Sequence, residues 1–164
     1  MILQHLHIDL DRTTILNKCL KDSYNRNLKP YYVPTSDIGV LENITHSYGD
    51  TKKHTQPHTW DELQPLVREL NRITCINTIH RSWYSIMSYG GHVREHHHPK
   101  GEKYVCVYYA EVLPEHNPIE FKLDDWVAVY PKPGDFFIFP KECLHRVAKQ
   151  LTCHQIRCTI NFEI

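Results

Sequence analysis

The chain has 164 residues, a length typical of one domain, and its 19 basic and 19 acidic residues balance at neutral pH. This balance and the sequence pI of about 7.2 give no sign of a surface built for nucleic acid or for an anionic membrane, although they are compatible with a local basic groove. Thirteen histidines are a high count for this length, which raises the question of whether some of them have a functional role.

The start of the chain and its cysteines favour a cytoplasmic protein, or one in the host cytoplasm if its gene is viral. The first ten residues, MILQHLHIDL, contain no basic start and no long apolar run, so we expect no signal peptide. No segment approaches the roughly 20 apolar residues of a transmembrane helix, so we expect no membrane association. The six cysteines contain no CxxC pair, and we interpret them as reduced thiols.

The first third of the chain predicts a short strand, a helix and loops. Residues 6–10 alternate as in a strand, and residues 11–25 carry apolar side chains at helical spacing, with Asp11 as the N-cap. Residues 29–39 contain two prolines and a glycine, which indicates turns. Residues 42–58 are polar and indicate a loop.

A second helix is predicted after this loop. Thr59 and Glu62 match a capping box. Pro65 lies too deep for a first turn that begins at Thr59, so we expect the regular helix to start near Pro65. One face of this helix is apolar and is formed by Leu63, Leu66, Val67, Leu70 and Ile73.

From residue 74 onward the pattern changes to strands rich in β-branched and aromatic residues, separated by Pro and Gly turns. The expected strands cover residues 74–89, ended by the GGH at 90–92, and then residues 103–112, 125–131, 134–140 and 154–164. This order predicts a mainly β fold with flanking helices, either a β-sandwich or a jelly roll. We expect one domain over residues 1–164, with helical support at 1–73 and the jelly-roll core at 74–164.

Three consecutive histidines precede the strand expected at residues 103–112. Residues two apart on a strand point to the same face, so His96 and His98 project together and His97 projects to the other side. The run alone fits a solvated turn, but His145, in PGDFFIFPKECLH, is a candidate third ligand for a metal. Imidazole and carboxylate ligands that leave coordination positions open favour non-haem Fe(II). We therefore expect a metal site in the jelly-roll core.

A candidate anion site follows on the last expected strand. Arg157 and Thr159 share a strand face by the same alternation. A guanidinium with a neighbouring hydroxyl can hold a carboxylate through paired hydrogen bonds. The C-terminal half therefore offers three histidines for a metal and one Arg/Thr pair for an anionic co-substrate.

The succession of H-x-H, PGDFFIFP, LH and RCTINF over residues 79–164 resembles the 2-oxoglutarate/Fe(II)-dependent dioxygenase superfamily, especially the small oxygenases related to prolyl hydroxylases, including phage-encoded ones. The resemblance implies a double-stranded β-helix, a cupin-like jelly roll with helices against one side. It also implies Fe(II) and 2-oxoglutarate as cofactors, molecular oxygen as a co-substrate, and C–H hydroxylation coupled to oxidative decarboxylation of 2-oxoglutarate. The implied substrate is a peptide or protein, with prolyl residues as the family-level expectation, or a small molecule.

Carried over residue by residue, the resemblance implies a metal site and a carboxylate site, formed by His96, His98 and His145 and by Arg157 and Thr159, respectively. Tyr104, and also Tyr84 and Tyr108, are candidates for further hydrogen-bond partners of the co-substrate, and packing within the strands is the alternative role of each. The sequence departs from the family pattern at His98, where an Asp or Glu is usual. Three neutral imidazoles put less negative charge on iron, which predicts weaker Fe(II) binding or altered oxidation.

Other interpretations stay open on the sequence alone. A cupin-like metal-binding protein without oxygenase activity would share the histidines, but it would not need Arg157. A degenerate oxygenase fold could serve assembly or protein interaction. A zinc site would have to use the residues that crowd the C-terminal region, Cys143, His145, Cys153, His154 and Cys158. The short paired spacings of structural zinc sites are missing there. A Cys/His nucleophile has no specific signal, since any cysteine can be paired with one of the thirteen histidines by chance.

Overall fold

The computed structural model describes residues 4–28, 41–48, 52, 55–99 and 103–164, so the turns predicted at 29–39 lie outside the described residues. The helices are α1 (Arg12–Asn25), the 3-10 turns η2 (Pro57–Thr59) and η3 (Asp61–Leu63), and α2 (Gln64–Thr74). The strands are β1 (Gln4–His7), β2 (Leu41–His46), β3 (Arg81–His96), β4 (Tyr104–Glu111), β5 (Ile119–Lys122), β6 (Trp126–Val129), β7 (Asp135–Pro140), β8 (His145–Val147) and β9 (Arg157–Glu163).

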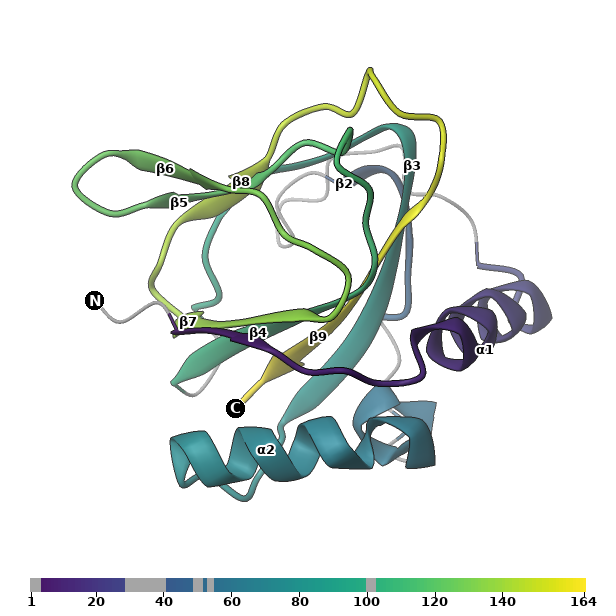
Figure 1. The fold of residues 1–164 in the computed structure, drawn as a ribbon, viewed down its shortest axis with the longest axis vertical. Coiled ribbons are helices and arrows are strands. Elements are labelled where there is room, and N and C mark those ends of the chain that lie inside the picture. The colour runs from purple at the N-terminus through teal and green to yellow at the C-terminus, as the bar shows by residue number, and fades with distance from the viewer. Residues whose placement is uncertain (1–3, 29–40, 49–51, 53–54, 100–102) are drawn as a thin grey trace.

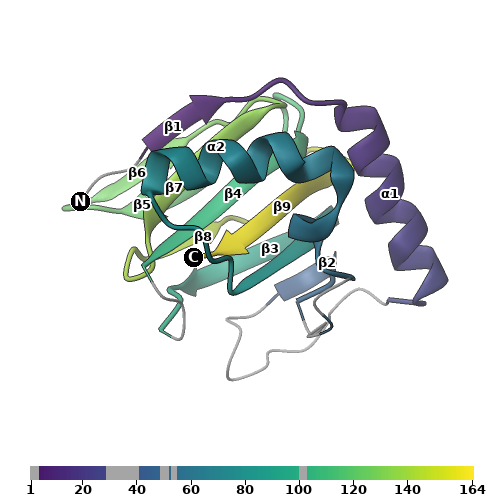
Figure 2. The same cartoon turned by 90° about the horizontal axis from the view of Figure 1, so that it is seen from below.

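The strands form one antiparallel sheet in the order β1-β7-β4-β9-β3-β8-β5-β6, with β2 paired to β3 beside this path. Figure 1 shows that the sheet curls over itself, so that β5, β6 and β8 lie across from β4, β7 and β9. Helices α1 and α2 lie on the outer side of the sheet, and α2 crosses over β4 and β9 (Figure 2). The predicted jelly roll with helices against one side is confirmed.

Strand β3 connects the two layers of the curl. Residues 81–87 pair with β9, whereas Val93 and His96 pair with β8. Gly90 lies between these two stretches with a φ of 79°, a conformation that suits glycine and bends the strand. The prediction that the GGH ends the strand was wrong, because the backbone continues to pair with Gln150 on both sides of the bend, through Gly90 N–H and Gly91 C=O at 2.6 and 2.9 Å.

The two helices start as their sequences allow. Asp11 caps α1 by accepting a hydrogen bond from the Thr14 N–H at 3.1 Å, which confirms that prediction. The capping box predicted at Thr59 is not formed, because the Thr59 hydroxyl donates to the Gln56 carbonyl instead. The regular helix starts at Gln64, close to the position expected from Pro65. No helix in the described part of the chain is long and apolar enough to span a membrane.

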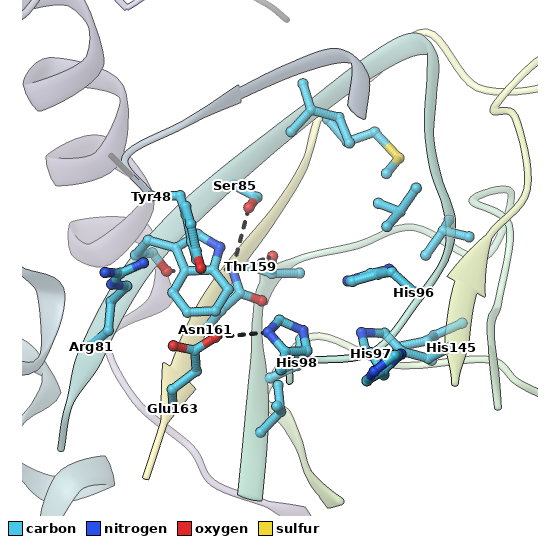
Figure 3. A pocket seen from close by; sticks show the side chains of 18 of the residues that line it. Tyr48, Arg81, Ser85, His96, His97, His98, His145, Thr159, Asn161 and Glu163 are labelled. Carbon is cyan, nitrogen blue, oxygen red and sulfur yellow. Dashed lines mark hydrogen bonds and ion pairs between the residues drawn. The ribbon is translucent and has the colours of Figure 1, made fainter. Parts of the chain in front are cut away.

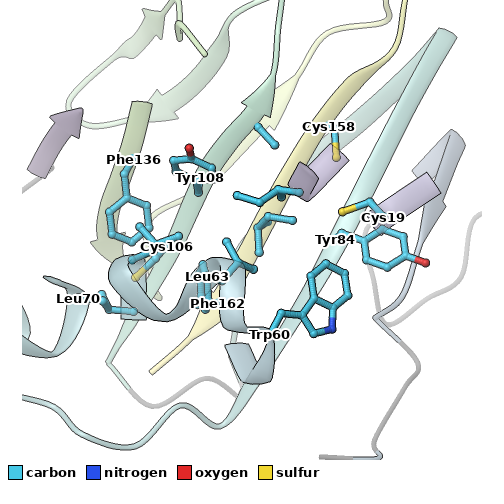
Figure 4. Packing of buried hydrophobic residues seen from close by; sticks show 14 of the residues in the cluster. Cys19, Trp60, Leu63, Leu70, Tyr84, Cys106, Tyr108, Phe136, Cys158 and Phe162 are labelled. Atoms are coloured by element: carbon cyan, nitrogen blue, oxygen red, sulfur yellow. The ribbon is translucent and has the colours of Figure 1, made fainter. Parts of the chain in front are cut away.

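The sheet separates two apolar layers, as β7 illustrates. Phe136 and Ile138 join a helix-side core between the sheet and the helices, whereas Phe137 and Phe139 join an inner core inside the curl. The helix-side core also contains Cys19, Trp60, Leu63, Leu70, Tyr84, Cys106, Tyr108, Cys158 and Phe162 (Figure 4). Because both faces are buried, β7 is apolar at consecutive positions and shows no alternation in its sequence.

Three strands were not predicted, namely β2, β5 and β8. Strand β2 falls partly within residues 42–58, where a loop was expected, and that expectation was wrong for its first part. Its sequence, LENITH, is mostly polar, although Ile44 is buried in the inner core. Strands β5 and β8 have four and three residues, too few to give a periodic signal.

Candidate active site

A cavity of about 480 Å³ opens inside the curled sheet. Figure 3 shows His96, His98 and His145 toward one end of this cavity and Tyr48 and Arg81 toward the other. The side chains between the two ends come largely from β3 and β9, whose paired segments form one wall. The cavity therefore brings the histidines predicted as ligands and the last strand into one enclosed space.

The end of β3 and the start of β8 position the three histidines. His96 ends β3, His145 begins β8, and the two residues are directly paired across these strands. His98 follows two residues after His96, and one nitrogen from each of the three rings lies within 4.8 Å of the others. The ring centroids are 4.1 Å apart for His96 and His145 and 5.3 Å apart for His98 and His145. The structure thus brings together all three predicted ligands.

The Nδ1 atoms of His96 and His145 are hydrogen-bonded to backbone carbonyls. The Nδ1 of His96 lies 2.9 Å from the Arg94 carbonyl, and the Nδ1 of His145 lies 2.9 Å from the Cys143 carbonyl. Since a carbonyl can only accept, both Nδ1 atoms carry the proton. This fixes the tautomer, and each Nε2 keeps its lone pair for the shared centre.

The third ring is held by a carboxylate. The Nδ1 of His98 lies 2.7 Å from Oε1 of Glu163, a residue of β9. The indole of Trp83 lies beside the same ring, with centroids 6.0 Å apart. The sequence interpretation missed Glu163, although it lies six residues after Arg157 and shares its strand face by simple alternation.

Burial keeps two of the imidazoles neutral. It lowers the pKa of His96 to about 4, with the nearby His98 adding to the effect. Burial, together with His96 and His98, holds the pKa of His145 well below its usual range. A neutral imidazole is the form that binds a metal, so these two rings need lose no proton to act as ligands near pH 7.

His97 differs from its two neighbours in its exposure to solvent. Its side chain is exposed at the edge of the cavity, and it does not belong to the nitrogen group formed by His96, His98 and His145. The cysteine-rich alternative does not come together either. Among the described residues the histidine group is the one cluster with metal-ligand spacing, and Cys143 and Cys158 lie in different apolar cores.

Strand β9 carries a polar row along the cavity. Its cavity-lining residues are buried and polar, and they are Arg157, Thr159, Asn161 and Glu163. The residues between them belong to the helix-side core and are Cys158, Ile160 and Phe162. The amide nitrogen of Asn161 lies 3.3 Å from the hydroxyls of Thr159 and Ser85, which ties the row to β3. Strand parity, applied beyond Thr159, would have found both Asn161 and Glu163.

Arg157 is a buried cation that retains unused donors. Its Nη1 donates to the Asn117 carbonyl at 2.7 Å, and its Nη2 donates to the Tyr109 hydroxyl at 3.1 Å. No carboxylate of the described residues forms an ion pair with it, although the side chain is only 4% exposed. A buried guanidinium without an anion is costly, so the geometry fits an anionic ligand that enters the cavity.

The tyrosines of β4 divide between the two faces of the sheet. Val105, Val107 and Tyr109 line the cavity, whereas Tyr104 and Tyr108 pack in the helix-side core. Tyr104, expected from the resemblance to bind the co-substrate, is therefore placed on the opposite face. Tyr84 lies in the same helix-side core. Tyr109 is the tyrosine that touches Arg157, and alternation along β4 from an inward-facing valine is the signal that could have identified it.

Comparisons with known proteins support the same arrangement of strands. No protein-family model and no curated protein matches the sequence. Solved structures do match over nearly the whole chain. A prolyl-4-hydroxylase from Pseudomonas putida has a TM-score of 0.67 at 14% identity, covering 98% of this chain and 91% of its own.

Two further prolyl hydroxylases match equally well. The viral collagen prolyl hydroxylase of Paramecium bursaria Chlorella virus-1, solved as a 2-oxoglutarate complex, has a TM-score of 0.67 at 13% identity and covers 99% of this chain and 95% of its own. The enzyme from Trichoplax adhaerens, in complex with a hypoxia inducible factor peptide, has a TM-score of 0.66 at 11% identity and covers 98% and 82%.

The chain has the fold of the 2-oxoglutarate/Fe(II)-dependent oxygenases. This oxygenase fold explains why a metal-ligand group and a buried arginine lie in the same cavity, since the strands of the curl converge there. At 11–14% identity the likeness concerns the fold alone. What the site does must be argued from its own residues.

Proposed function

We propose that the protein is an Fe(II)- and 2-oxoglutarate-dependent oxygenase that hydroxylates a peptide, protein or small-molecule substrate, with molecular oxygen as co-substrate. The observation that carries the proposal is the meeting of two sites in one cavity, the three-histidine group and the buried Arg157. A metal-binding module without redox activity would need only the first of these. Arg157 therefore favours the oxygenase over the cupin-like alternative.

The residues present fit the two absent groups. His96, His98 and His145 would hold the metal through their Nε2 atoms. Arg157 and Thr159 would hold the distal carboxylate of 2-oxoglutarate. Bound together, Fe(II) and 2-oxoglutarate would supply the activation of oxygen, coupled to decarboxylation of the co-substrate. The apolar inner core around them excludes water from the reacting centre.

The substrate would enter beside His98, where the Trp83 indole lies 6.0 Å from the His98 ring. Tyr48 and Arg81 extend this side of the cavity into a shelf, with the Arg81 guanidinium 4.6 Å from the centre of the Tyr48 ring and the Tyr48 and Trp83 rings 4.8 Å apart. Aromatic and cationic groups of this kind suit a peptide segment. The peptide bound to the Trichoplax enzyme agrees with a peptide substrate.

We further propose that residues 1–164 act as a single domain. A cytoplasmic location remains a prediction from the sequence.

The proposal is tested by succinate formation. The protein would be incubated with Fe(II), 2-oxoglutarate and oxygen, with and without proline-containing peptides, and succinate and hydroxylated peptide would be measured. We expect succinate to form and to increase when an accepted peptide is present. Absence of turnover with any substrate, combined with absence of 2-oxoglutarate binding, would contradict the oxygenase and leave the cupin-like binder.

Tyr109 and Tyr104 give a matched pair of variants on opposite faces of one strand. In Tyr109→Phe, Arg157 loses the hydroxyl that orients it, which should cost about 1 kcal/mol and weaken 2-oxoglutarate binding roughly 5-fold. In Tyr104→Phe, the same atom is removed from the helix-side layer, and we expect unchanged affinity. Calorimetric titration of both variants with 2-oxoglutarate measures the difference. The opposite ranking would restore Tyr104 as the co-substrate partner.

A further inference from the structure

The hydrogen bond between His98 and Glu163 is unlike the contacts of the other two histidines. It joins Nδ1 to a carboxylate oxygen at 2.7 Å, and both side chains are nearly buried, with 10% and 9% exposure. His96 and His145 direct the same atom at uncharged backbone carbonyls. Among the described residues, no other carboxylate forms an ion pair with any of the three rings. Within the part of the chain that the structure describes, Glu163 is thus the one negative charge in direct contact with the proposed metal ligands.

The backbone holds Glu163 firmly in this place. In the sheet, Glu163 is paired with Arg81 of β3 on one side and with Val105 of β4 on the other. Its carbonyl also accepts a hydrogen bond from the His80 N–H at 2.9 Å. Because β9 is paired on both edges, the backbone of Glu163 is fixed in the middle of the sheet. Such an anchored group can set the orientation of a ring.

Glu163 also stays available to His98 electrostatically. No lysine or arginine of the described residues lies within ion-pair distance of it, including its cross-strand neighbour Arg81. A carboxylate that accepts from Nδ1–H fixes the proton on that atom, aims the Nε2 lone pair at the metal centre and makes the imidazole a stronger donor. Its charge is then shared with the ligand instead of being cancelled by a surface cation.

We propose that Glu163 is a positioning residue that supplies, through His98, the negative charge that a directly bound carboxylate supplies in a two-histidine, one-carboxylate site. The inference rests on the proposed metal site and adds to it the source of the missing charge. It also connects the metal end of the cavity to β9, the strand that carries Arg157. With the metal bound, the site would have the same formal charge as a two-histidine, one-carboxylate site, although its three ligands are neutral.

Metal titration of a double-mutant cycle tests this role without any turnover. Co(II) is added to the wild type, Glu163→Gln, His98→Asp and the double variant, and the absorption of bound Co(II) gives affinity and ligand set. We expect Glu163→Gln to weaken binding by roughly 10- to 100-fold while the band shape is kept, since no ligand is lost. In the His98→Asp background, two carboxylates would face each other, so Glu163→Gln should strengthen binding.

The sign reversal separates a positioning role from a merely structural one. A structural role would weaken Co(II) binding by the same factor in both backgrounds, and that result would overturn the inference, as would a change below about 2-fold in the wild type. Glu62→Gln, which removes an ion pair with Lys18 far from the cavity, is the control and should leave the Co(II) affinity unchanged.

The same titrations separate this inference from the proposed function. If the wild type binds 2-oxoglutarate and Co(II) normally while Glu163→Gln has no effect, the proposed function stands without this inference. If the wild type binds no Co(II), both are contradicted.

Discussion

Replacing His145 by alanine is expected to abolish Fe(II) binding at micromolar metal and, with it, all succinate formation. His145 is the most enclosed of the three ligands, and its ring lies 4.9 Å from that of Phe139 and 4.1 Å from that of His96. Loss of one of three ligands should exceed the roughly 10- to 100-fold penalty typical of groups that only orient a ligand. Anaerobic titration with Fe(II) measures the affinity, and coupled succinate detection measures turnover.

Two further variants make this result specific. His145→Gln fills most of the same space without an imidazole, so it controls for a cavity left in the inner core. His97→Ala removes a histidine one residue from two of the ligands, yet its ring is exposed and outside the nitrogen group, so we expect nearly wild-type affinity for Fe(II). Metal binding that survives in His145→Ala but fails in His97→Ala would show that the strand parity is assigned to the wrong histidines.

Arg157→Ala is expected to weaken 2-oxoglutarate binding by about 3 kcal/mol, roughly 100-fold, while Fe(II) affinity changes by less than about 3-fold. The guanidinium is buried, and the two neutral groups it contacts, the Asn117 carbonyl and the Tyr109 hydroxyl, cannot replace an anion. Its removal leaves a co-substrate carboxylate desolvated without a partner. Separate titrations with metal and with 2-oxoglutarate give the two affinities.

The contrast between the two ligands decides what Arg157 does. Equal losses of metal and 2-oxoglutarate affinity would argue that Arg157 only supports the fold. Arg157→Lys keeps the charge but loses the planar fork, so it should bind 2-oxoglutarate with intermediate affinity. Arg72→Ala is the matched surface control, because Arg72 pairs with Glu69 on the exposed side of α2 and should leave both affinities unchanged.

The elements that the sequence could predict are those with a clear period or a short-range signal. The alternation of side chains along a strand predicted that His96 and His98 share one face and that Arg157 and Thr159 share another. In the structure, all four residues line the same cavity. The N-cap at Asp11 is a contact over three residues, and it forms as expected. Helix-side and inner residues of β7 could not be separated by pattern, since both faces are apolar, yet the strand itself was evident.

The elements that could not be predicted depend on contacts between distant segments. Whether Tyr104 or Tyr109 faces the arginine is decided by which side of β4 meets the helices, and the sequence of β4 is apolar on both sides. The bond from His98 to Glu163 spans 65 positions of the chain. Gly90 bends β3 instead of ending it, because Gln150 supplies the backbone partner there. The helix and strand propensities of the individual residues do not predict any of these long-range contacts.

Strand β9 is the last strand in chain order, yet it lies in the middle of the sheet, between β3 and β4. During synthesis, β3 and β4 would leave the ribosome with the edges that face β9 unpaired, and such edges invite aggregation until the final strand inserts. Long-range insertion of this kind is slow. Arg157 and Glu163 arrive with this strand, so the step that inserts β9 also brings the side chains of the proposed co-substrate site into the cavity. Until β9 is inserted, His98 would lack its partner Glu163 and the cavity would lack Arg157, so 2-oxoglutarate would bind only after this insertion.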